Sequence, residues 1–284
     1  MQTRDLAADR QELKALHLLA EQDLLQKSES MSPGALFNTA HVYRVSGPSI
    51  HPQVLLSLVG SKSESNRKVG WKLAAAKPSP EIARTIESIL GQALTRGRES
   101  TILMPEMASA IQENSIKTAF SFLVLGLMQQ GAPEFANAML ALDPGKAAGP
   151  FIDYLNRTDL EDLRQLNQKY VNLLTCTVIF RFFSENPLPL SHPGVGQIFQ
   201  FAVSRNRALA EMSFAVLEKN LSENRLALAS LLARQPVQVQ VAFIENSQRD
   251  LTANLRLFLA NMKDVAQQKE VMEELNSQQG SSEQ

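Results

Sequence analysis

The chain has 284 residues, of which 44% are hydrophobic and 20% are charged, and its formal net charge is −1. This composition is typical of a globular protein with a sizeable core, and the near-zero charge creates no global field toward nucleic acid or a membrane surface. The single cysteine, Cys176, excludes an internal disulfide framework and is compatible with a reducing compartment. No stretch reaches the roughly 18 apolar residues that a membrane span requires, and the N-terminus lacks the apolar run of a signal peptide. We therefore expect a cytoplasmic protein without a membrane span.

Residues 1–50 are predicted to form an N-terminal helix and an irregular linker. In residues 28–50, Ser32-Pro33 is a good helix start, whereas residues 40–46 (AHVYRVS) alternate like a short strand. A short helix followed by a loop is favoured there. The first helix is expected from about Asp5 to Gln26, because apolar residues follow helical spacing on one face: Leu6, Leu13, Leu16, Ala20 and Leu24.

Residues 51–157 are predicted to form helical hairpins, because short apolar segments alternate with clear start and stop signals. Ser79-Pro80-Glu81 combines a cap, a proline at the first helical position and an acid in the first turn. Ser61 and Glu64 match a capping box. The expected helices are Pro52–Val59, Lys62–Ala76, Pro80–Thr95, Pro105–Glu113, Ser115–Met128, Pro133–Leu142 and a further helix from Asp143-Pro144 to Leu155.

Residues 158–276 are predicted to contain a long central helix followed by C-terminal helical hairpins. The central helix is expected over Thr158–Glu185, with Thr158 and Glu161 as a capping box. Nearly every face of Val171–Phe183 is apolar, which predicts that this helix is buried on all sides. The helices expected after it are Pro193–Val203, Arg205–Lys219, Glu223–Arg234, Val237–Glu245 and Arg249–Leu275, followed by a disordered tail over residues 277–284.

One of these helices has an open alternative. Residues 237–244 (VQVQVAFI) alternate like a strand, but the start at Pro236 and the helical neighbours favour a helix. The predicted fold class is therefore all-α, with stacked helical hairpins around a long buried central helix, either as an irregular α-solenoid or as a multi-helix bundle.

A weak internal repeat accompanies this pattern. His51-Pro52-x-Val54 precedes Asn66-Arg67 by about one helix, and His192-Pro193-x-Val195 precedes Asn206-Arg207 in the same way. Residues 51–82 resemble a HEAT or armadillo repeat: a short helix, a tight polar turn, and a helix with basic residues before an apolar-aromatic stripe. The resemblance implies an architecture and no family function.

The sequence contains no recognisable catalytic, cofactor-binding or metal-binding motif. Cys176 lies within an apolar run, so we expect an inert core thiol and not a nucleophile. The histidines are far apart and lack the acidic or histidine partners of a metal site: His17, His41, His51 and His192. No cofactor is therefore predicted.

Basic residues outnumber acidic ones between Ser61 and Arg98, and Trp71 lies among them. Such a stretch could bind phosphate, RNA or an acidic partner. The favoured interpretation is a solvated helix face with Trp71 in the core. The candidate patch consists of Lys62, Arg67, Lys68, Lys72, Lys77, Arg96 and Arg98.

The predicted C-terminal helix is the second candidate interaction site. Packing on the preceding hairpin is the favoured interpretation. The alternative is that its later turns bind a partner, since a terminal helix is easily shared with a neighbour. The candidate interaction helix carries Leu255, Phe258, Met262, Val265 and Met272.

These observations favour a non-enzymatic protein–protein interaction subunit, either an adaptor or a structural component of a larger assembly. Its partners would be other protein subunits, because a helical stack without catalytic motifs offers extended surface. The alternative is a nucleic-acid-binding, nucleoprotein-like protein that uses the basic stretch at residues 61–98. An enzyme with dispersed catalytic residues is the third possibility.

Overall fold

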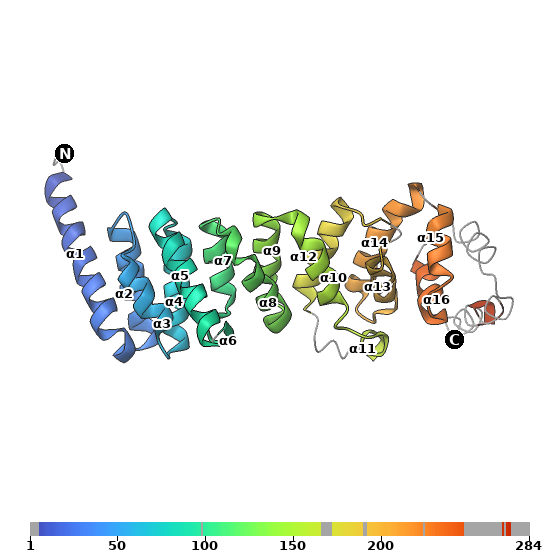
Figure 1. Cartoon of the computed structure of the whole chain (residues 1–284), viewed down its shortest axis with the longest axis horizontal. Helices are drawn as coiled ribbons and strands as arrows, with labels where there is room; N and C mark the ends of the chain where they lie inside the picture. The colour runs from blue at the N-terminus through green and yellow to red at the C-terminus, as the bar shows by residue number, and fades with distance from the viewer. Residues whose placement is uncertain are drawn as a thin grey trace, which may run out of the picture. The chain divides into compact units, whose positions relative to one another are not determined.

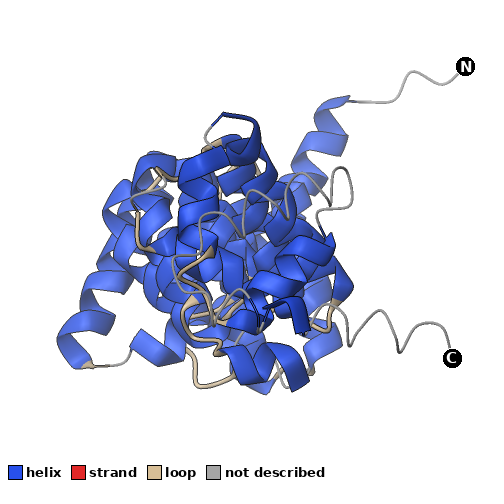
Figure 2. Ribbon diagram, turned by 90° about the vertical axis from the view of Figure 1, so that its right-hand side faces the viewer, coloured by secondary structure: helices blue, strands red, loops and turns tan. Residues whose placement is uncertain are grey.

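The computed structural model describes residues 6–97, 99–165, 172–189, 192–223, 225–246, 269 and 271–273. These residues form sixteen α-helices and three short 3-10 helices, and no strand occurs among them (Figure 2). The all-α prediction is confirmed. None of the described helices is long and apolar enough to cross a membrane.

The chain divides into two compact units, Met1–Ala147 and Ala148–Gln284. The division falls within α10 (Pro144–Leu155). The domain boundary between residues 157 and 158, which the sequence suggests, stays a prediction.

In the N-terminal unit, helices that are neighbours in sequence lie side by side (Figure 1). The first helix packs on the second, the third on the fourth and the eighth on the ninth. The fourth helix also contacts the second and the seventh, and the seventh contacts the ninth, so these four helices form a row. The bounds are α1 (Leu6–Lys27), α2 (Pro33–Ser46), α3 (Pro52–Gly60), α4 (Glu64–Ala76), α5 (Pro80–Arg96), α6 (Glu99–Ile102), α7 (Pro105–Glu113), α8 (Phe120–Gln130) and α9 (Pro133–Leu142).

The predicted start and stop signals form most of these helix ends. Ser79 Oγ accepts a hydrogen bond from the backbone N–H of Ile82 at the start of α5, and Pro80 is the first helical residue. Gly97 and Gly131 end α5 and α8 in the left-handed conformation, with φ of 59° and 63°. Only glycine adopts that conformation without a steric penalty, so both residues suit their positions.

Two predictions in this unit need correction. The strand-like residues 40–46 belong to α2, which is longer than expected because Leu36, Ala40 and Tyr43 are buried at helical spacing. The capping box at Ser61 is not formed, since α4 begins after Ser63 as N-cap. Ser61 Oγ instead accepts hydrogen bonds from the backbone N–H of Ser63 and the side-chain amide of Asn66.

The C-terminal unit is built around α14. This helix contacts α12, α13, α15 and α16, so it holds the central position that the prediction assigned to Thr158–Glu185. Aromatic side chains fill the core, and the rings of Phe180 and Phe201 meet edge to face at 5.3 Å. The bounds are α11 (Leu160–Gln165), α12 (Leu173–Glu185), α13 (Gly194–Gln200), α14 (Arg207–Glu223), α15 (Arg225–Leu232) and α16 (Val237–Asn246). The last of these confirms the helix over the strand alternative.

The predicted long helix over Thr158–Glu185 is not continuous. Asn172 has an extended backbone and caps α12 with its side chain, which accepts hydrogen bonds from the N–H groups of Leu174 and Thr175. The hydroxyl of buried Tyr154 accepts a hydrogen bond from Asn172 N–H at 2.8 Å, which holds the chain in place at the helix start. At α11, Asp159 Oδ1 accepts from the N–H of Asp162, so the cap is Asp159 and not the predicted Thr158.

The prediction that Val171–Phe183 is buried on all sides is also wrong for α12. Ile179, Phe180 and Phe183 are buried, but Thr177 and Arg181 are exposed on the opposite side. The helix is therefore amphipathic in the fold. The predicted helix over Arg249–Leu275 and the predicted tail lie largely outside the described residues. Within this range the structure describes Lys269 and residues 271–273, which are helical.

Candidate interaction groove

A groove of about 560 Å³ lies between three helices of the N-terminal unit. The central helix of the three, α4, contacts both α2 and α7, so it forms the floor while the other two form the walls. The lining residues are Phe37, Ala40, His41 and Arg44 of α2, Val69, Lys72, Leu73, Ala75 and Ala76 of α4, and Glu106, Ser109 and Glu113 of α7.

Asn114, which directly follows α7, fixes the α7 wall of the groove against the floor. Its side-chain amide donates to the carbonyl oxygen of Ala74 at 3.0 Å, and its side-chain oxygen accepts from the N–H of Ser79 at 3.2 Å. On the opposite side of α4, Trp71 is fully buried in the core. The floor therefore has one face locked in the core and one face open to the groove.

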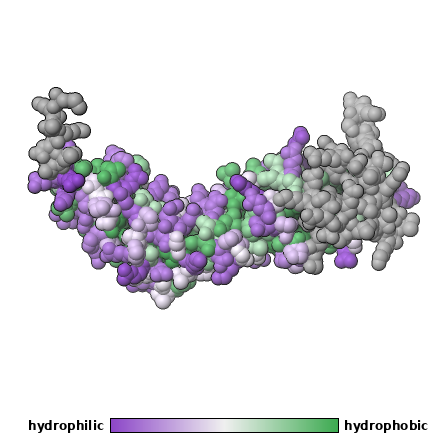
Figure 3. Space-filling model, turned by 90° about the horizontal axis from the view of Figure 1, so that it is seen from above, coloured by the Kyte–Doolittle hydropathy of each residue, from purple (hydrophilic) through white to green (hydrophobic). Residues whose placement is uncertain are grey.

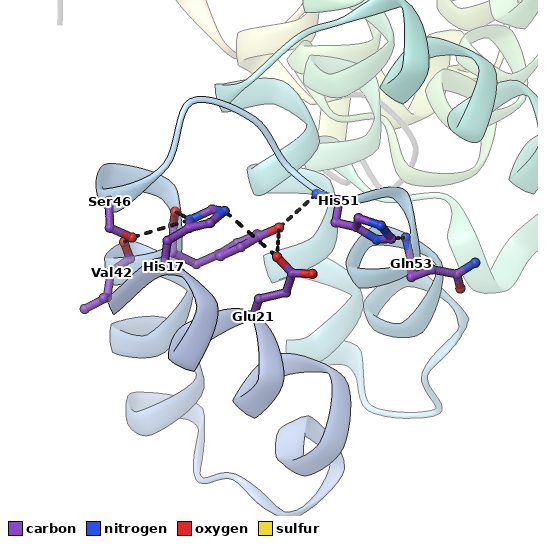
Figure 4. A network of polar contacts seen from close by, with 7 residues as sticks. His17, Glu21, Val42, Ser46, His51 and Gln53 are labelled. Carbon is purple, nitrogen blue, oxygen red and sulfur yellow. Dashed lines mark hydrogen bonds and ion pairs between the residues drawn. The ribbon is translucent and has the colours of Figure 1, made fainter. Parts of the chain in front are cut away.

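The α2 wall is held by a polar network that joins three helices (Figure 4). The ring of His17 on α1 stacks on Tyr43 of α2, with centroids 4.3 Å apart, and its Nδ1 lies 3.1 Å from the Tyr43 carbonyl oxygen. The Tyr43 hydroxyl accepts from the N–H of His51 at the start of α3 and donates to Glu21 of α1. The members of this network come from three separate segments, so no local sequence pattern predicts it.

The two walls of the groove carry opposite charge. His41 and Arg44 lie on the α2 wall, where the Arg44 guanidinium is 3.2 Å from His41 Nδ1. Glu106 and Glu113 lie on the α7 wall. Lys72 on the floor is 3.9 Å from Glu106 Oε1, a distance that leaves this ion pair loose. The groove is therefore basic along one side and acidic along the other.

Glu106 is incompletely satisfied within the protein. Its side chain is only 20% exposed, and its Oε2 atom is buried with no hydrogen-bond partner among the described residues. A buried carboxylate oxygen without a donor costs free energy.

Apolar side chains line part of the floor and the rim of the groove. Ala40, Val69 and Leu73 are buried side chains that lie along its base. Phe37 lies at the rim and is 56% exposed. The groove thus combines an apolar base with charged walls, as specific interaction sites do.

Of the predicted basic patch residues that the structure describes, only Lys72 lines this groove. Lys68 forms an ion pair with Glu64 at 2.6 Å, and their hydrogen bond and opposite charges raise the pKa of Lys68 and lower that of Glu64. The guanidinium of Arg67 donates to the carbonyl oxygens of Ser61 and Lys62. Much of this positive charge is thus partnered within the protein.

The other patch residues lie on different segments. Lys62 lies between α3 and α4, Lys77 directly follows α4, and Arg96 lies in the last turn of α5. Arg98 lies outside the described residues. Of the C-terminal candidate residues, Met272 is described and half-buried beside buried Val271. The others, Leu255, Phe258, Met262 and Val265, lie outside the described residues.

The remaining chemical candidates have structural roles. Cys176 is fully buried, and burial raises the pKa of its thiol, which disfavours the reactive thiolate. His51 Nδ1 accepts from the N–H of Gln53, and His192 Nδ1 accepts from that of Gly194, each at a helix start. The described residues contain no group of three His, Cys, Asp or Glu side chains that could hold a metal ion.

Comparison of the chain with protein-family models, with curated proteins and with solved structures found no match.

A second surface feature lies on α1 and α2. Hydrophilic residues cover much of the N-terminal unit, and hydrophobic residues reach the surface in patches between them (Figure 3). Most of the large exposed hydrophobic residues in the described part of the chain belong to these two helices. They are Leu13, Leu16, Leu18, Leu19 and Leu25 on α1, and Phe37, Val42 and Val45 on α2.

Proposed function

We propose that this protein is a non-enzymatic, cytoplasmic interaction subunit that joins other proteins into a larger assembly. The observation that carries the proposal is the concentration of exposed large hydrophobic side chains on α1 and α2. Exposed apolar clusters of this kind mark interaction surfaces in soluble proteins.

The outward face of α1 supports this function most directly. Leu18 and Leu19 are each 59% exposed. Ala15 and Gln22, which lie within one helical turn of both leucines on the same side, carry no charge and are exposed. A helix that packed on its own unit alone would place charged residues at these positions of its outward face. The face is therefore suited to a protein partner.

A HEAT-like or armadillo-like arrangement of the helix pairs belongs to the same proposal. His51 and His192 accept backbone hydrogen bonds at the starts of α3 and α13. In the turns that follow these segments, Ser61 and Ser204 each accept a hydrogen bond from the N–H two residues later. The same local hydrogen-bonding pattern occurs in both units, which supports a repeated structural element.

The test compares proteins recovered with the wild type and with a Leu18→Glu, Leu19→Glu double variant from the native host. Both side chains are exposed, so the variant should fold with an unchanged circular dichroism spectrum and melting temperature within a few degrees. We expect at least one protein that copurifies stoichiometrically with the wild type to be lost from the variant.

A Lys62→Glu variant is the matched control, because Lys62 is exposed and lies off this face. It should recover the same proteins as the wild type. Identical recovery with all three proteins, or no stoichiometric partner for the wild type, would reject an interaction function for the α1 face.

A further inference from the structure

We infer that the groove between α2 and α7 binds an amphipathic helix of a partner protein, whose apolar ridge is flanked by acidic residues on one side and basic residues on the other. This inference rests on the proposed interaction function and specifies the chemistry of one partner. It depends on three features of the groove: its charge pattern, its loosely paired Glu106 carboxylate and its backbone.

The charge pattern of the groove determines which charge each flank of the bound helix carries. Arg44 on the α2 wall attracts acidic side chains, and Glu106 and Glu113 on the α7 wall attract basic ones. The apolar base formed by Ala40, Val69 and Leu73 accepts the apolar ridge that lies between the two flanks of the bound helix. A helix with the same charge on both flanks would meet repulsion at one wall.

Glu106 indicates where a basic flank binds. Its side chain is 20% exposed, and Lys72 approaches its Oε1 only at 3.9 Å, which leaves this pair loose. A lysine or arginine on the partner's flank adds a second positive charge beside this carboxylate. Charge-assisted hydrogen bonds of this kind are about twice as strong as neutral ones.

The backbone of the groove favours a helix over an extended peptide. The floor and both walls are helices, whose interior N–H and carbonyl groups are paired within each helix. They offer no sheet edge on which an extended peptide could form a strand, whereas a helix satisfies its own backbone. Along α7, the lining residues run from Glu106 to Glu113, which spans about 10 Å, or two helical turns.

The probes are three fluorescein-labelled, end-capped peptides of about 18 residues with an identical leucine ridge on an alanine helix. The mixed peptide carries glutamate on one flank and arginine on the other. The second carries arginine on both flanks and the third glutamate on both. Binding to the full-length protein is measured by fluorescence anisotropy at about 50 and 150 mM NaCl.

We expect the wild type to bind the mixed peptide about fivefold more tightly than either uniform peptide, a ratio that corresponds to exposed ion pairs. Arg44→Glu makes both walls acidic, so this variant should prefer the peptide with arginine on both flanks. Glu113→Arg leaves Glu106 as the remaining acidic lining residue of the α7 wall and adds a positive charge to the same wall. This variant should therefore lose much of the preference for the mixed peptide over the peptide with glutamate on both flanks. The two changes thus shift the order of affinities in opposite directions.

Lys62→Glu changes the same type of charge outside the groove, so it should keep the wild-type order. An order of affinities that neither wall variant changes would overturn the inference, as would the absence of binding by the mixed peptide. If either outcome is observed while the Leu18→Glu, Leu19→Glu double variant still loses a partner, the interaction function stands without a groove ligand. If both experiments fail, the proposed function fails as well.

Discussion

Tyr43 shows how much of the N-terminal unit depends on one side chain. Its ring is fully buried against His17, and its hydroxyl connects α1, α2 and the start of α3. Burial and the nearby charge of Glu21 raise the pKa of Tyr43 to about 12, although its bond to His51 N–H acts in the opposite direction. The neutral phenol is therefore the form that the fold requires.

Tyr43→Phe should lower the free energy of unfolding by about 1 to 3 kcal/mol at pH 8, because the buried N–H of His51 loses its acceptor. Urea denaturation followed by circular dichroism measures this loss. A change below about 0.5 kcal/mol would show that the hydroxyl does not support the α2 wall.

The same substitution should have a pH-dependent effect. A pKa of about 12 in the folded state lies above the ordinary value of 10.0, so the stability that neutral Tyr43 contributes is complete below pH 10 and is lost as pH rises to 12. The phenylalanine variant has no such group. The stability difference between the two proteins should therefore shrink by about 1 kcal/mol between pH 8 and pH 11. A difference that is constant with pH would contradict the raised pKa.

Phe180→Ala should destabilise the C-terminal unit by about 3 to 5 kcal/mol, through the lost burial and the cavity left behind. The ring is 1% exposed and packs edge to face on Phe201. Arg181→Ala, one residue along on the exposed side of α12, is the matched control and should cost little. Denaturant melts in which both variants lose less than about 1 kcal/mol would rule out the predicted packing.

At the scale of elements, local sequence signals predict where a helix begins and ends better than they predict whether a helix is continuous. The bounds of α7 and α9, each opened by a proline, coincide with the expected ones. The expected helix over Thr158–Glu185 fails because Asn172 adopts an extended conformation and starts a new helix. A hydrogen bond to Tyr154, eighteen residues earlier, holds that position, and helical periodicity carries no information about such a contact.

Asn172→Ala should therefore cost about 1 kcal/mol, the usual value of an N-cap side chain. Asn172→Ser keeps a capping oxygen and should retain most of the stability. The measurement is again the free energy of unfolding in urea. Equal stability of the alanine variant and the wild type would mean that the Tyr154 contact alone fixes the helix start.

At the scale of the whole molecule, charges of both signs alternate and largely offset one another. The net charge is −1, and Lys68 and Lys72 of the basic stretch lie near Glu64 and Glu106. This arrangement weakens the case for nucleic acid as the partner, because phosphate binding draws on unpaired positive charge.

Titration with single-stranded RNA and duplex DNA at about 50 and 200 mM salt tests that alternative. We expect only weak binding at low salt, near 10⁻⁴ to 10⁻⁶ M or weaker, and little change in a Lys68→Glu, Lys72→Glu double variant. Sub-micromolar binding at 200 mM salt that the double variant abolishes would favour the nucleic-acid function over the one proposed.

The candidate site was only partly visible in the sequence. Lys72 belongs to the predicted basic stretch and does line the groove, but the sequence grouped it with residues that lie elsewhere or are paired, such as Lys68 and Arg67. The opposite wall, with Glu106 and Glu113, comes from a segment over thirty residues away by number. No local pattern connects it to Lys72.

The sequence by itself determined the all-α class and most helix ends, because caps, prolines and helical periodicity act within a few residues. It also indicated that Trp71 and Cys176 lie in the core. Only the tertiary structure decided which helix faces stay exposed. Leu13 and Leu16 follow the apolar stripe of α1 yet remain exposed, whereas Ala20 and Leu24 of the same stripe are buried. Periodicity places residues on a common face, but burial requires a neighbouring element at each point along it, and long-range packing alone supplies those neighbours.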